Sequence, residues 1–542
     1  MSNWVDTIPL LSRFPALPAQ IVLPGLVLIG IYGFTAVKRR FWDDKTTPLR
    51  GPPNPSFFFG HYKTVNQAED RSQLYENWVN EYGPAYWIST GFGSKRIIIC
   101  DPKANGHFYS KETYGYVQTK LSRVFIENLF GRGLLWAEGD SHRRQRKALS
   151  PAFSNAAIRK LTPVFYDAAY QLKALWDNKL DAGENSFDVQ ICLDSIGIAG
   201  FGHNFQAIEG KESPVVEVFE SFGSTDTSII SQLIFFLGPV FPMLQRLPTK
   251  RNRMFKRLRS TIRGISDELL ERNRREKEGL STGETDKSII GLLVKAETAS
   301  SSLGMSEEEI LAQNVLLLAG YETTSISLTW ALIELSRKPE KQQRLRDELA
   351  EFSGSDPTFD QLSTGLPYLD AIAQEVLRLH PPVSETTRIA AEDDVIPFSK
   401  PFKTADGKLV SELFVSKGTV VSSPISYMNM SEELWGSDSR EFRPERWLAD
   451  ESTSGSVLSQ RAKEIGGHKH ILTFVDGPRL CLGKSFALAE FKAVLSVLIR
   501  NYSFELPDGP QTKIEKHPSI LPRPKLAGEK GARVPLKVKK ID

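Results

Sequence analysis

The chain has 542 residues, of which 40% are hydrophobic, and its 68 basic and 65 acidic residues leave a formal charge of +3. This composition excludes a disordered chain, and the small charge excess gives no general reason to expect nucleic-acid binding. Cys100, Cys192 and Cys481 are too few and too scattered for a disulfide framework or a cysteine-rich zinc site. We therefore expect reduced thiols in a reducing compartment, with at least one free for chemistry.

The N-terminal segment contains a long apolar run. Residues 14–37 include no charged side chain over 24 positions, which is long enough to cross roughly 30 Å of hydrocarbon. A cleaved signal peptide or a buried core helix are the alternatives, but the run is long for a signal peptide and no small-residue cleavage site precedes the basic cluster 38–40. Because this cluster follows the run, the positive-inside rule predicts that the rest of the chain is cytosolic. Residues 1–44 are thus predicted to form a single-pass membrane anchor with its basic flank.

The rest of the chain divides simply. Residues 45–64 are rich in proline, which favours an extended, stiff hinge. Residues 65–542 contain no second linker, no repeat and no other charge-free run of spanning length, so they are predicted to form one large catalytic domain. Strand-like alternation is confined to short pieces such as 95–100 and 411–426. We expect a mainly α-helical fold with small β-sheets (α+β).

A basic segment, "GDSHRRQRKALSPAF", occupies residues 139–153. Such a run is usually the solvated face of a helix. Further along, a predicted helix begins at a capping box formed by Ser306 and Glu309 and ends just before Pro339. A helix of about thirty residues is long enough to cross a whole domain. It contains "LLLAGYETTS", residues 316–325, whose glycine and threonines are mediocre helix formers that packing alone could tolerate.

The segment "QEVLRLHPPV" places Glu375 and Arg378 on one face of a helix that ends at two prolines. The same spacing occurs at residues 271/274 and 334/337, where the ordinary interpretation is a weak surface ion pair. Position distinguishes the first pair, because only this pair is followed by "LHPPV" and later by "FRPERW", which contains Arg446.

The segment "TFVDGPRLCLGKS", residues 473–485, surrounds Cys481 with residues suited to a metal-bound thiolate. Gly477 and Gly483 allow backbone conformations that are closed to residues with a Cβ. Phe474 can cover the sulfur, and Arg479 can meet an anionic group beside the metal. The apolar sequence that follows has helical periodicity, so the sulfur is expected near a helix N-terminus, which favours a thiolate.

These residues resemble a known pattern. Phe-x-x-Gly-x-Arg-x-Cys-x-Gly is the haem-ligand signature of the cytochrome P-450 family of haem-thiolate monooxygenases, and the chain fills each fixed position with Phe474, Gly477, Arg479, Cys481 and Gly483. The resemblance covers nearly the whole chain, since the other motifs follow in the family's order. It implies the cytochrome P-450 fold and a haem b cofactor, with Cys481 as the ligand of its iron.

The resemblance also implies roles for residues outside the cysteine loop. Gly320 would let the central helix pass close to dioxygen, Thr323 would donate a hydrogen bond to it, and Glu322 would help to relay protons. The remaining three residues, Glu375, Arg378 and Arg446, would form a cluster that holds the fold together and takes no part in chemistry.

By the same resemblance, the haem propionates would be bound by Arg479, Arg388 and Arg146 together with His142. The sequence departs from the common family pattern here, because that pattern has tryptophan where His142 stands. A propionate contact from His142 therefore stays open, and the alternative is a partly exposed helix histidine.

The implied reaction inserts one atom of dioxygen into a C–H or C=C bond and reduces the other to water. The chain has no glycine-rich dinucleotide site, so NADPH would act indirectly through a separate flavoprotein reductase, which the basic face around residues 143–147 would attract. The implied location is the endoplasmic reticulum membrane. Two alternatives are a peroxide isomerase or dehydratase of the same fold, disfavoured by the acid–threonine pair, and a membrane-tethered haem-binding protein without turnover.

The substrate is expected to be lipophilic. The apolar stretch 232–248 could lie against the membrane and line an entrance, and the segments near Val383 and Ile520 would face the pocket by family analogy; plain core is the alternative. A terpenoid, sterol, fatty acyl chain or polycyclic aromatic would fit, and the sequence resembles fungal members of the family that act in secondary metabolism.

Overall fold

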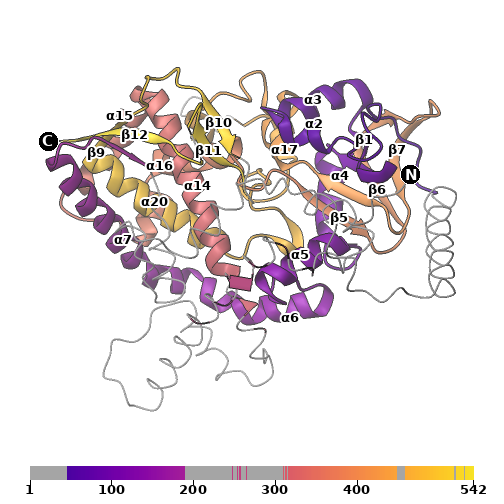
Figure 1. The fold of residues 1–542 in the computed structure, drawn as a ribbon, viewed down its shortest axis with the longest axis horizontal. Coiled ribbons are helices and arrows are strands. Elements are labelled where there is room, and N and C mark those ends of the chain that lie inside the picture. The colour runs from indigo at the N-terminus through magenta and orange to yellow at the C-terminus, as the bar shows by residue number, and fades with distance from the viewer. Residues whose placement is uncertain are drawn as a thin grey trace, which may run out of the picture.

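A helix-rich part and a sheet-rich part lie side by side in the molecule (Figure 1). The computed structural model describes residues 45–188, 315–448, 458–517, 521–529 and 531–541, together with isolated positions between 247 and 313. The α-helices are α2 (Tyr62–Gln67), α3 (Arg71–Tyr82), α4 (Pro102–Ser110), α5 (Lys120–Phe130), α6 (Gly139–Leu149), α7 (Asn155–Asp181), α14 (Val315–Arg337), α15 (Pro339–Leu349), α16 (Pro367–Leu379), α17 (Ile425–Met430), α18 (Glu432–Trp435), α19 (Gln460–Lys463) and α20 (Lys484–Asn501).

The strands form four small sheets in the described residues. The largest has the order β1-β2-β8-β5-β3, and the others are β4-β12-β9, the hairpin β6-β7 and the hairpin β10-β11. Their bounds are β1 (Ala85–Ser89), β2 (Lys95–Ile99), β3 (Tyr116–Val117), β4 (Ser186–Asp188), β5 (Thr386–Ala390), β6 (Asp394–Lys403), β7 (Leu409–Val415), β8 (Val420–Ser423), β9 (Tyr502–Glu505), β10 (Ile514–His517), β11 (Arg523–Leu526) and β12 (Pro535–Lys540). All pairs are antiparallel except β2 with β8.

Side-chain caps fix the starts of several helices. The carboxylate of Asp101 accepts a hydrogen bond from the Ala104 N–H, and Pro102 occupies the first turn of α4, where its missing N–H costs nothing. The hydroxyl of Ser154 caps α7 in the same way by accepting from the Ala157 N–H. These local signals set where α4 and α7 begin, independently of the packing around them.

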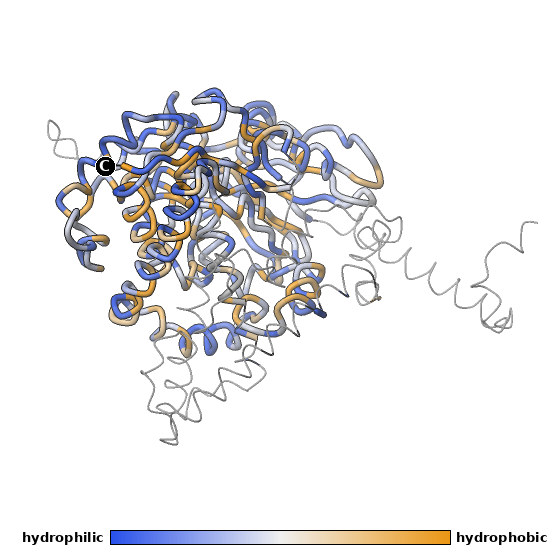
Figure 2. The backbone as a smooth tube through the Cα atoms, turned by 60° about the vertical axis from the view of Figure 1, so that its left-hand side comes forward, coloured by the Kyte–Doolittle hydropathy of each residue, from blue (hydrophilic) through white to orange (hydrophobic). Residues whose placement is uncertain are grey.

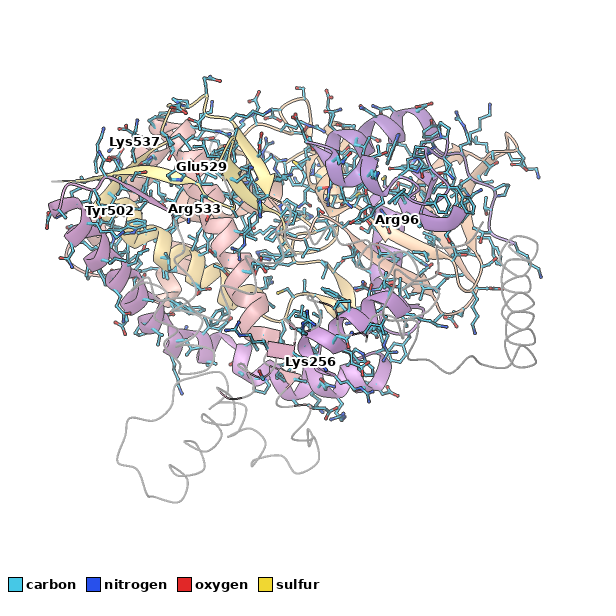
Figure 3. The ribbon with its side chains drawn as sticks, viewed as in Figure 1. Arg96, Lys256, Tyr502, Glu529, Arg533 and Lys537 are labelled. Carbon is cyan, nitrogen blue, oxygen red and sulfur yellow. The ribbon has the colours of Figure 1, made fainter. Side chains whose placement is uncertain are left out.

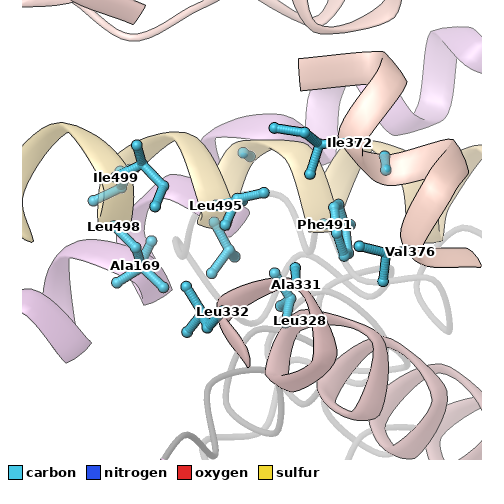
Figure 4. Packing of buried hydrophobic residues seen from close by; sticks show 14 of the residues in the cluster. Ala169, Leu328, Ala331, Leu332, Ile372, Val376, Phe491, Leu495, Leu498 and Ile499 are labelled. Carbon is cyan, nitrogen blue, oxygen red and sulfur yellow. The ribbon is translucent and has the colours of Figure 1, made fainter. Parts of the chain in front are cut away.

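The helix-rich part is organised around α20. Figure 4 shows Phe491, Leu495 and Leu498 of α20 among apolar side chains of α7, α14 and α16. We call this cluster the helical core; it also includes side chains from β9 and β12. Full burial of each large aliphatic side chain contributes about 1.5–3 kcal/mol. Figure 2 shows hydrophobic and hydrophilic residues alternating along the helical coils of the described chain.

A second cluster, the sheet core, joins α3, α4 and α17 to the five-stranded sheet and the β6-β7 hairpin. Arg96 of β2 lies on this side of the molecule (Figure 3) and pairs with Glu385 at 2.5 Å. At the opposite end, the Tyr502 hydroxyl donates to the Lys173 carbonyl of α7 at 3.0 Å, which ties the three-stranded sheet to the helical core. The two cores meet along α16 and the loop before α20.

The predicted fold class, helices with small sheets, is confirmed. The central helix ends at Arg337 as predicted, while its predicted start at Ser306 lies outside the described residues. Residues 95–99 form β2, and the segment 411–426 contains the end of β7 and all of β8. The predicted anchor, residues 14–37, also lies outside the described part, within which no helix combines the length and apolar character needed to span a bilayer.

Candidate functional site

The loop that carries Cys481 is held between the two cores. Thr473 Oγ1 donates to the Leu377 carbonyl of α16 at 2.6 Å, and the Leu472 N–H donates to Asn429 Oδ1 at 2.9 Å. Cys481 is flanked by two leucines that diverge, since Leu480 packs against the sheet core and Leu482 against the helical core. The cysteine therefore sits on the seam between the cores.

Gly477 uses the backbone freedom that glycine allows, whereas Gly483 does not. Gly477 has φ +65°, and a Cβ there would lie 2.3 Å from the Tyr109 carbonyl oxygen of α4, so the loop approaches α4 more closely than any side chain permits. Gly483 has φ −85° and space for a Cβ, whose nearest neighbour would be Phe153 at 3.8 Å. Gly483 thus does not use the conformational freedom that a glycine allows, and backbone strain gives no reason for a glycine there.

Cys481 is enclosed by protein and yet accessible. Burial raises the pKa of its thiol, whereas the Gly483 N–H and the charges of Arg146 and Lys484 lower the pKa. Despite this enclosure, its side chain is exposed to solvent. The sulfur is therefore within reach of a ligand, although burial still acts on its pKa. Phe474 is buried with its ring edge-on to His468, at 6.0 Å between centroids.

Helix α6 brings His142 and Arg146 close to Arg479. The charge of Arg146 acts on Cys481, and no described residue forms a hydrogen bond or ion pair with its guanidinium group. His142 is buried, and burial together with Arg479 and Arg146 lowers its pKa to about 4. A neutral imidazole can donate one hydrogen bond but brings no charge to an anionic ligand. The alternative of a partly exposed histidine is thereby wrong.

Two further arginines complete the cluster, and each already has an acidic partner. Arg388 of β5 lies 2.8 Å from Glu112, and Arg479 donates to Glu138 and to the Ala137 carbonyl, both at 2.6 Å. Burial raises the pKa of Glu112, in spite of the opposing charges of Arg388 and Arg479.

Taken together, these residues fit a haem. The thiol of Cys481 is accessible. Arg146, Arg388 and Arg479 lie close enough for their charges to interact, and Arg146 has no partner in the described chain. A haem needs one axial ligand and cations for two carboxylates, and this set provides both. The structure thus brings together the five predicted residues Cys481, Arg479, Arg388, Arg146 and His142.

Helix α14 packs against α20 close to this cluster. Thr324 lies beside Glu490 of α20, and Glu490 is six residues beyond the helix start at Lys484, or about 9 Å along the axis. Thr323 is the neighbour of Thr324 in α14, and Gly320 lies about one turn before it. The Thr323 hydroxyl donates to the Ala319 carbonyl at 2.6 Å, so it must exchange this partner before it can donate elsewhere.

Glu375, Arg378 and Arg446 form the predicted cluster. Arg378 Nε and Nη2 donate to the two carboxylate oxygens of Glu375 at 2.9 and 2.8 Å, and Arg446 Nε donates to one of them at 3.0 Å. Glu375 and Arg378 are completely buried. Arg378 also donates to the main-chain carbonyls of Asn429 and Ser439, so the cluster fastens α16 to the chain that leads into the cysteine loop.

The pair at 334/337 is more than the surface ion pair that was expected. Glu334 is buried and accepts from Arg337 at 3.2 Å and from His380 at 2.9 Å, while the His380 ring stacks on Trp330. The pair at 271/274 lies outside the described residues.

Sequence reasoning missed four residues of this region: Glu112, Glu138, Glu490 and Arg523. Glu490 is fully buried, and its carboxylate oxygens have no hydrogen-bond partner of standard geometry in the described chain. It was visible as the single acidic residue within the apolar sequence that follows Cys481. Arg523 donates to Glu322 at 3.2 Å. Nothing in the local sequence "LPRPKL" predicts that contact, which joins residues 201 positions apart.

An accessible, enclosed cysteine at the start of a long helix, with arginines around it and a Gly-x-Glu-Thr segment on the facing helix, defines a haem-thiolate protein. Residues 50–528 match the family model described as "Cytochrome P450". The chain is 59% identical to cytochrome P450 monooxygenase claP and 58% identical to claQ, both of Ampulloclitocybe clavipes, over 92% of this chain and 94% of each relative. It is 33% identical to ganoderic acid synthetase CYP5150L8 of Ganoderma lucidum, over 90% of this chain and 93% of that protein. The chain belongs to the cytochrome P450 family and is a monooxygenase.

Proposed function

We propose that this protein is a membrane-anchored monooxygenase of the endoplasmic reticulum that hydroxylates or epoxidises a lipophilic secondary metabolite, such as a terpenoid, with NADPH electrons from a separate flavoprotein reductase. The enclosed but accessible thiol of Cys481 carries this proposal, because it is the feature that lets the chain hold an iron cofactor. In this proposal residues 1–44 anchor the chain, residues 45–64 form the hinge and residues 65–542 form the catalytic domain.

The cofactor is proposed to be haem b, which when bound supplies the reactive iron that activates dioxygen. Cys481 would ligate the iron as a thiolate, since metal binding removes the thiol proton. Arg146, Arg388 and Arg479 would bind the propionates by charge, and His142 would add one hydrogen bond as a neutral donor. Phe474, Gly477 and Gly483 would shape the loop around the sulfur.

Protons would be managed from α14. Gly320 leaves room beside the helix for dioxygen, the Thr323 hydroxyl would orient dioxygen and water, and Glu322 would exchange protons with that water. The buried position of Glu322 keeps it out of bulk solvent, so protons reach it through a small number of groups.

The substrate class rests on the relatives and on the sequence. One relative is named for the synthesis of ganoderic acid, and the larger group of close relatives comprises fungal monooxygenases. Val383 lies four residues beyond the end of α16 with 38% of its surface exposed, as an apolar residue at a pocket would. The other predicted pocket segments, at Ile520 and at 232–248, lie outside the described residues apart from Leu247.

Two measurements test the proposal. Ferrous protein with carbon monoxide should show the red-shifted Soret band of thiolate ligation, and Cys481→His should abolish the band; a normal thiolate spectrum in that variant would refute the assignment. Purified protein with reductase and NADPH should then consume oxygen when members of a lipophilic library are added. Product formation without NADPH would instead indicate an isomerase or a dehydratase of the same fold, and haem binding with no turnover of any library member would oppose the proposed reaction.

A further inference from the structure

The carboxyl group of Glu322 is held by an arginine from the far end of the chain. Arg523, the first residue of β11, donates through Nε to Glu322 Oε1 at 3.2 Å. Both side chains are largely buried, with 3% of Glu322 and 12% of Arg523 exposed. Strand β11 packs on α14 at this point, and both side chains of the contact are largely buried between the two elements.

The geometry of α14 places this contact on the flank of the helix. Ala319 and Thr323 are four residues apart and share one face, which the hydrogen bond between them confirms. Glu322 is rotated by about 100° from Thr323. Its carboxyl group therefore points to the hairpin and not to the side on which Thr323 lies. The single contact through Nε, without a second parallel bond, leaves the carboxyl group able to turn.

We propose that Arg523 is a positioning residue of the monooxygenase reaction, which holds the Glu322 carboxyl group on the flank of α14 from where it passes protons toward Thr323. The inference rests on the proposed proton-transfer roles of Glu322 and Thr323. In each cycle the carboxylate takes one proton from water, becomes a neutral acid, and gives that proton to water beside Thr323, which restores the carboxylate. Arg523 changes neither the number of protons nor their origin.

Arg523 also controls how readily the proton is released. Burial raises the pKa of Glu322, and the charge and hydrogen bond of Arg523 oppose this shift. Two other ionisable groups beside α14, Glu490 of α20 and His380 just after α16, contact Thr324 and Glu334 instead. His517 of β10 pairs across the hairpin with Arg523, and burial together with the charges of Lys525 and Arg523 lowers its pKa. Without Arg523, burial alone would act on Glu322 and its pKa would rise further. A proton relay works best when its pKa lies near the working pH, so the acid would then donate too weakly.

The first test measures the titration of Glu322 directly. Infrared spectra of haem-loaded protein would be recorded against pH, with Glu322→Gln as the reference, so that the carbonyl stretch of the neutral Glu322 carboxyl group is isolated from that of Glu490. Arg523→Met should move the titration midpoint of this band to higher pH. Lys525→Met is the matched control, because it removes one positive charge from the same face of β11 without touching Glu322, and it should leave the midpoint unchanged. A midpoint in Arg523→Met equal to that of wild type would overturn the proposal.

The second test measures coupling. Product per NADPH should fall about threefold or more in Arg523→Met, with the difference appearing as hydrogen peroxide, and Arg523→Lys should restore much of the loss. In the Glu322→Gln background, Arg523→Met should cause no further loss, because the arginine acts through Glu322. Independent, multiplying losses would overturn the proposal. Should Arg523→Met fail to fold, Arg523→Lys and Arg523→Gln test the same titration. A wild-type protein that forms no product would refute the proposed function but not the role of Arg523, because the infrared titration does not depend on turnover.

Discussion

Replacing Glu375 by glutamine tests the buried charge cluster with the smallest change of shape. The carboxylate of Glu375 accepts five hydrogen bonds, from two nitrogens of Arg378, from Arg446, from the Arg443 N–H and from Trp447 Nε1. An amide keeps one acceptor oxygen but turns the other position into an N–H₂ donor, which faces other donors. It also removes the only negative charge that these hydrogen bonds place against the buried Arg378.

The expected cost follows from this geometry. Removing one partner of a fully buried ion pair destabilises a protein by about 3–5 kcal/mol, because the remaining charge is left uncompensated. Total stabilities are commonly about 5–15 kcal/mol, so Glu375→Gln should lose a large part of the free energy of unfolding. Glu464→Gln is the matched control, since Arg461 and Glu464 have the i,i+3 spacing but side chains that are 26% and 42% exposed. Its expected cost is about 0–1 kcal/mol.

The assay is urea denaturation of the purified protein, followed by far-ultraviolet circular dichroism and by the Soret absorbance in parallel, because loss of a cofactor and loss of helix need not coincide. Glu375→Gln should unfold at clearly lower urea than wild type, and Glu464→Gln at nearly the same concentration. Equal shifts in the two variants would show that the buried charges of the cluster stabilise the fold no more than an exposed ion pair does.

Four other predictions follow from the structure. Thr323→Ala should keep the thiolate spectrum, and its rate of NADPH consumption should stay within about tenfold of wild type, or about 1.4 kcal/mol in barrier. Most of the electrons should then go to hydrogen peroxide. An unchanged ratio of product to NADPH would show that Thr323 takes no part in proton delivery. Gly477→Ala should lower the haem content of purified protein, because its Cβ would lie 2.3 Å from the Tyr109 carbonyl oxygen, and full haem content would contradict this reading of the loop. Deletion of residues 1–42 should move much of the protein from the membrane to the soluble fraction on centrifugation, whereas a carbonate-resistant membrane pool would point to another attachment surface. Finally, burial opposes the ionisation of Glu375, but Arg378 and Arg446 outweigh burial and lower the pKa of Glu375. The stabilisation from its charge is therefore present above the unfolded pKa of about 4.3 and is lost as pH falls through the folded pKa. The difference in free energy of unfolding between wild type and Glu375→Gln should thus shrink in acid.

The sequence was sufficient for the cysteine loop and for the helix that follows it because their signals are local. Glycine and proline at fixed spacing restrict the backbone around Cys481, and a period of 3.6 residues marks α20 without knowledge of its partners. The same locality explains why the end of α14 and the strand β2 were predicted within a residue. The local pattern did not show which of the two glycines uses its conformational freedom, since the backbone of Gly483 is one that any residue can adopt.

The partners of the charged residues were beyond sequence reasoning. Arg479 and Glu138 are 341 positions apart, and Arg523 and Glu322 are 201 apart. No periodicity or spacing links residues at such distances, because the contact depends on how complete elements dock. His142 shows the same limit, since its helix position was evident but its burial, and hence its neutral state, depends on Arg479 and the rest of the enclosure.

The position of Cys481 on the seam between the two cores has a consequence for how the cell obtains working enzyme. Leu480 and Leu482 can be seated only when the sheet core and the helical core have both formed, and Gly477 must meet a carbonyl that lies more than three hundred residues earlier in the chain. A nascent chain with one core assembled does not hold the proposed iron ligand in place, so cofactor binding would come late in folding and would depend on both cores. Because a tightly bound group stabilises only the state that binds it, the bound cofactor would then stabilise the chains in which both cores have folded. Lesions far from the site, in either core, should therefore appear first as protein without haem, and only afterwards as protein without activity.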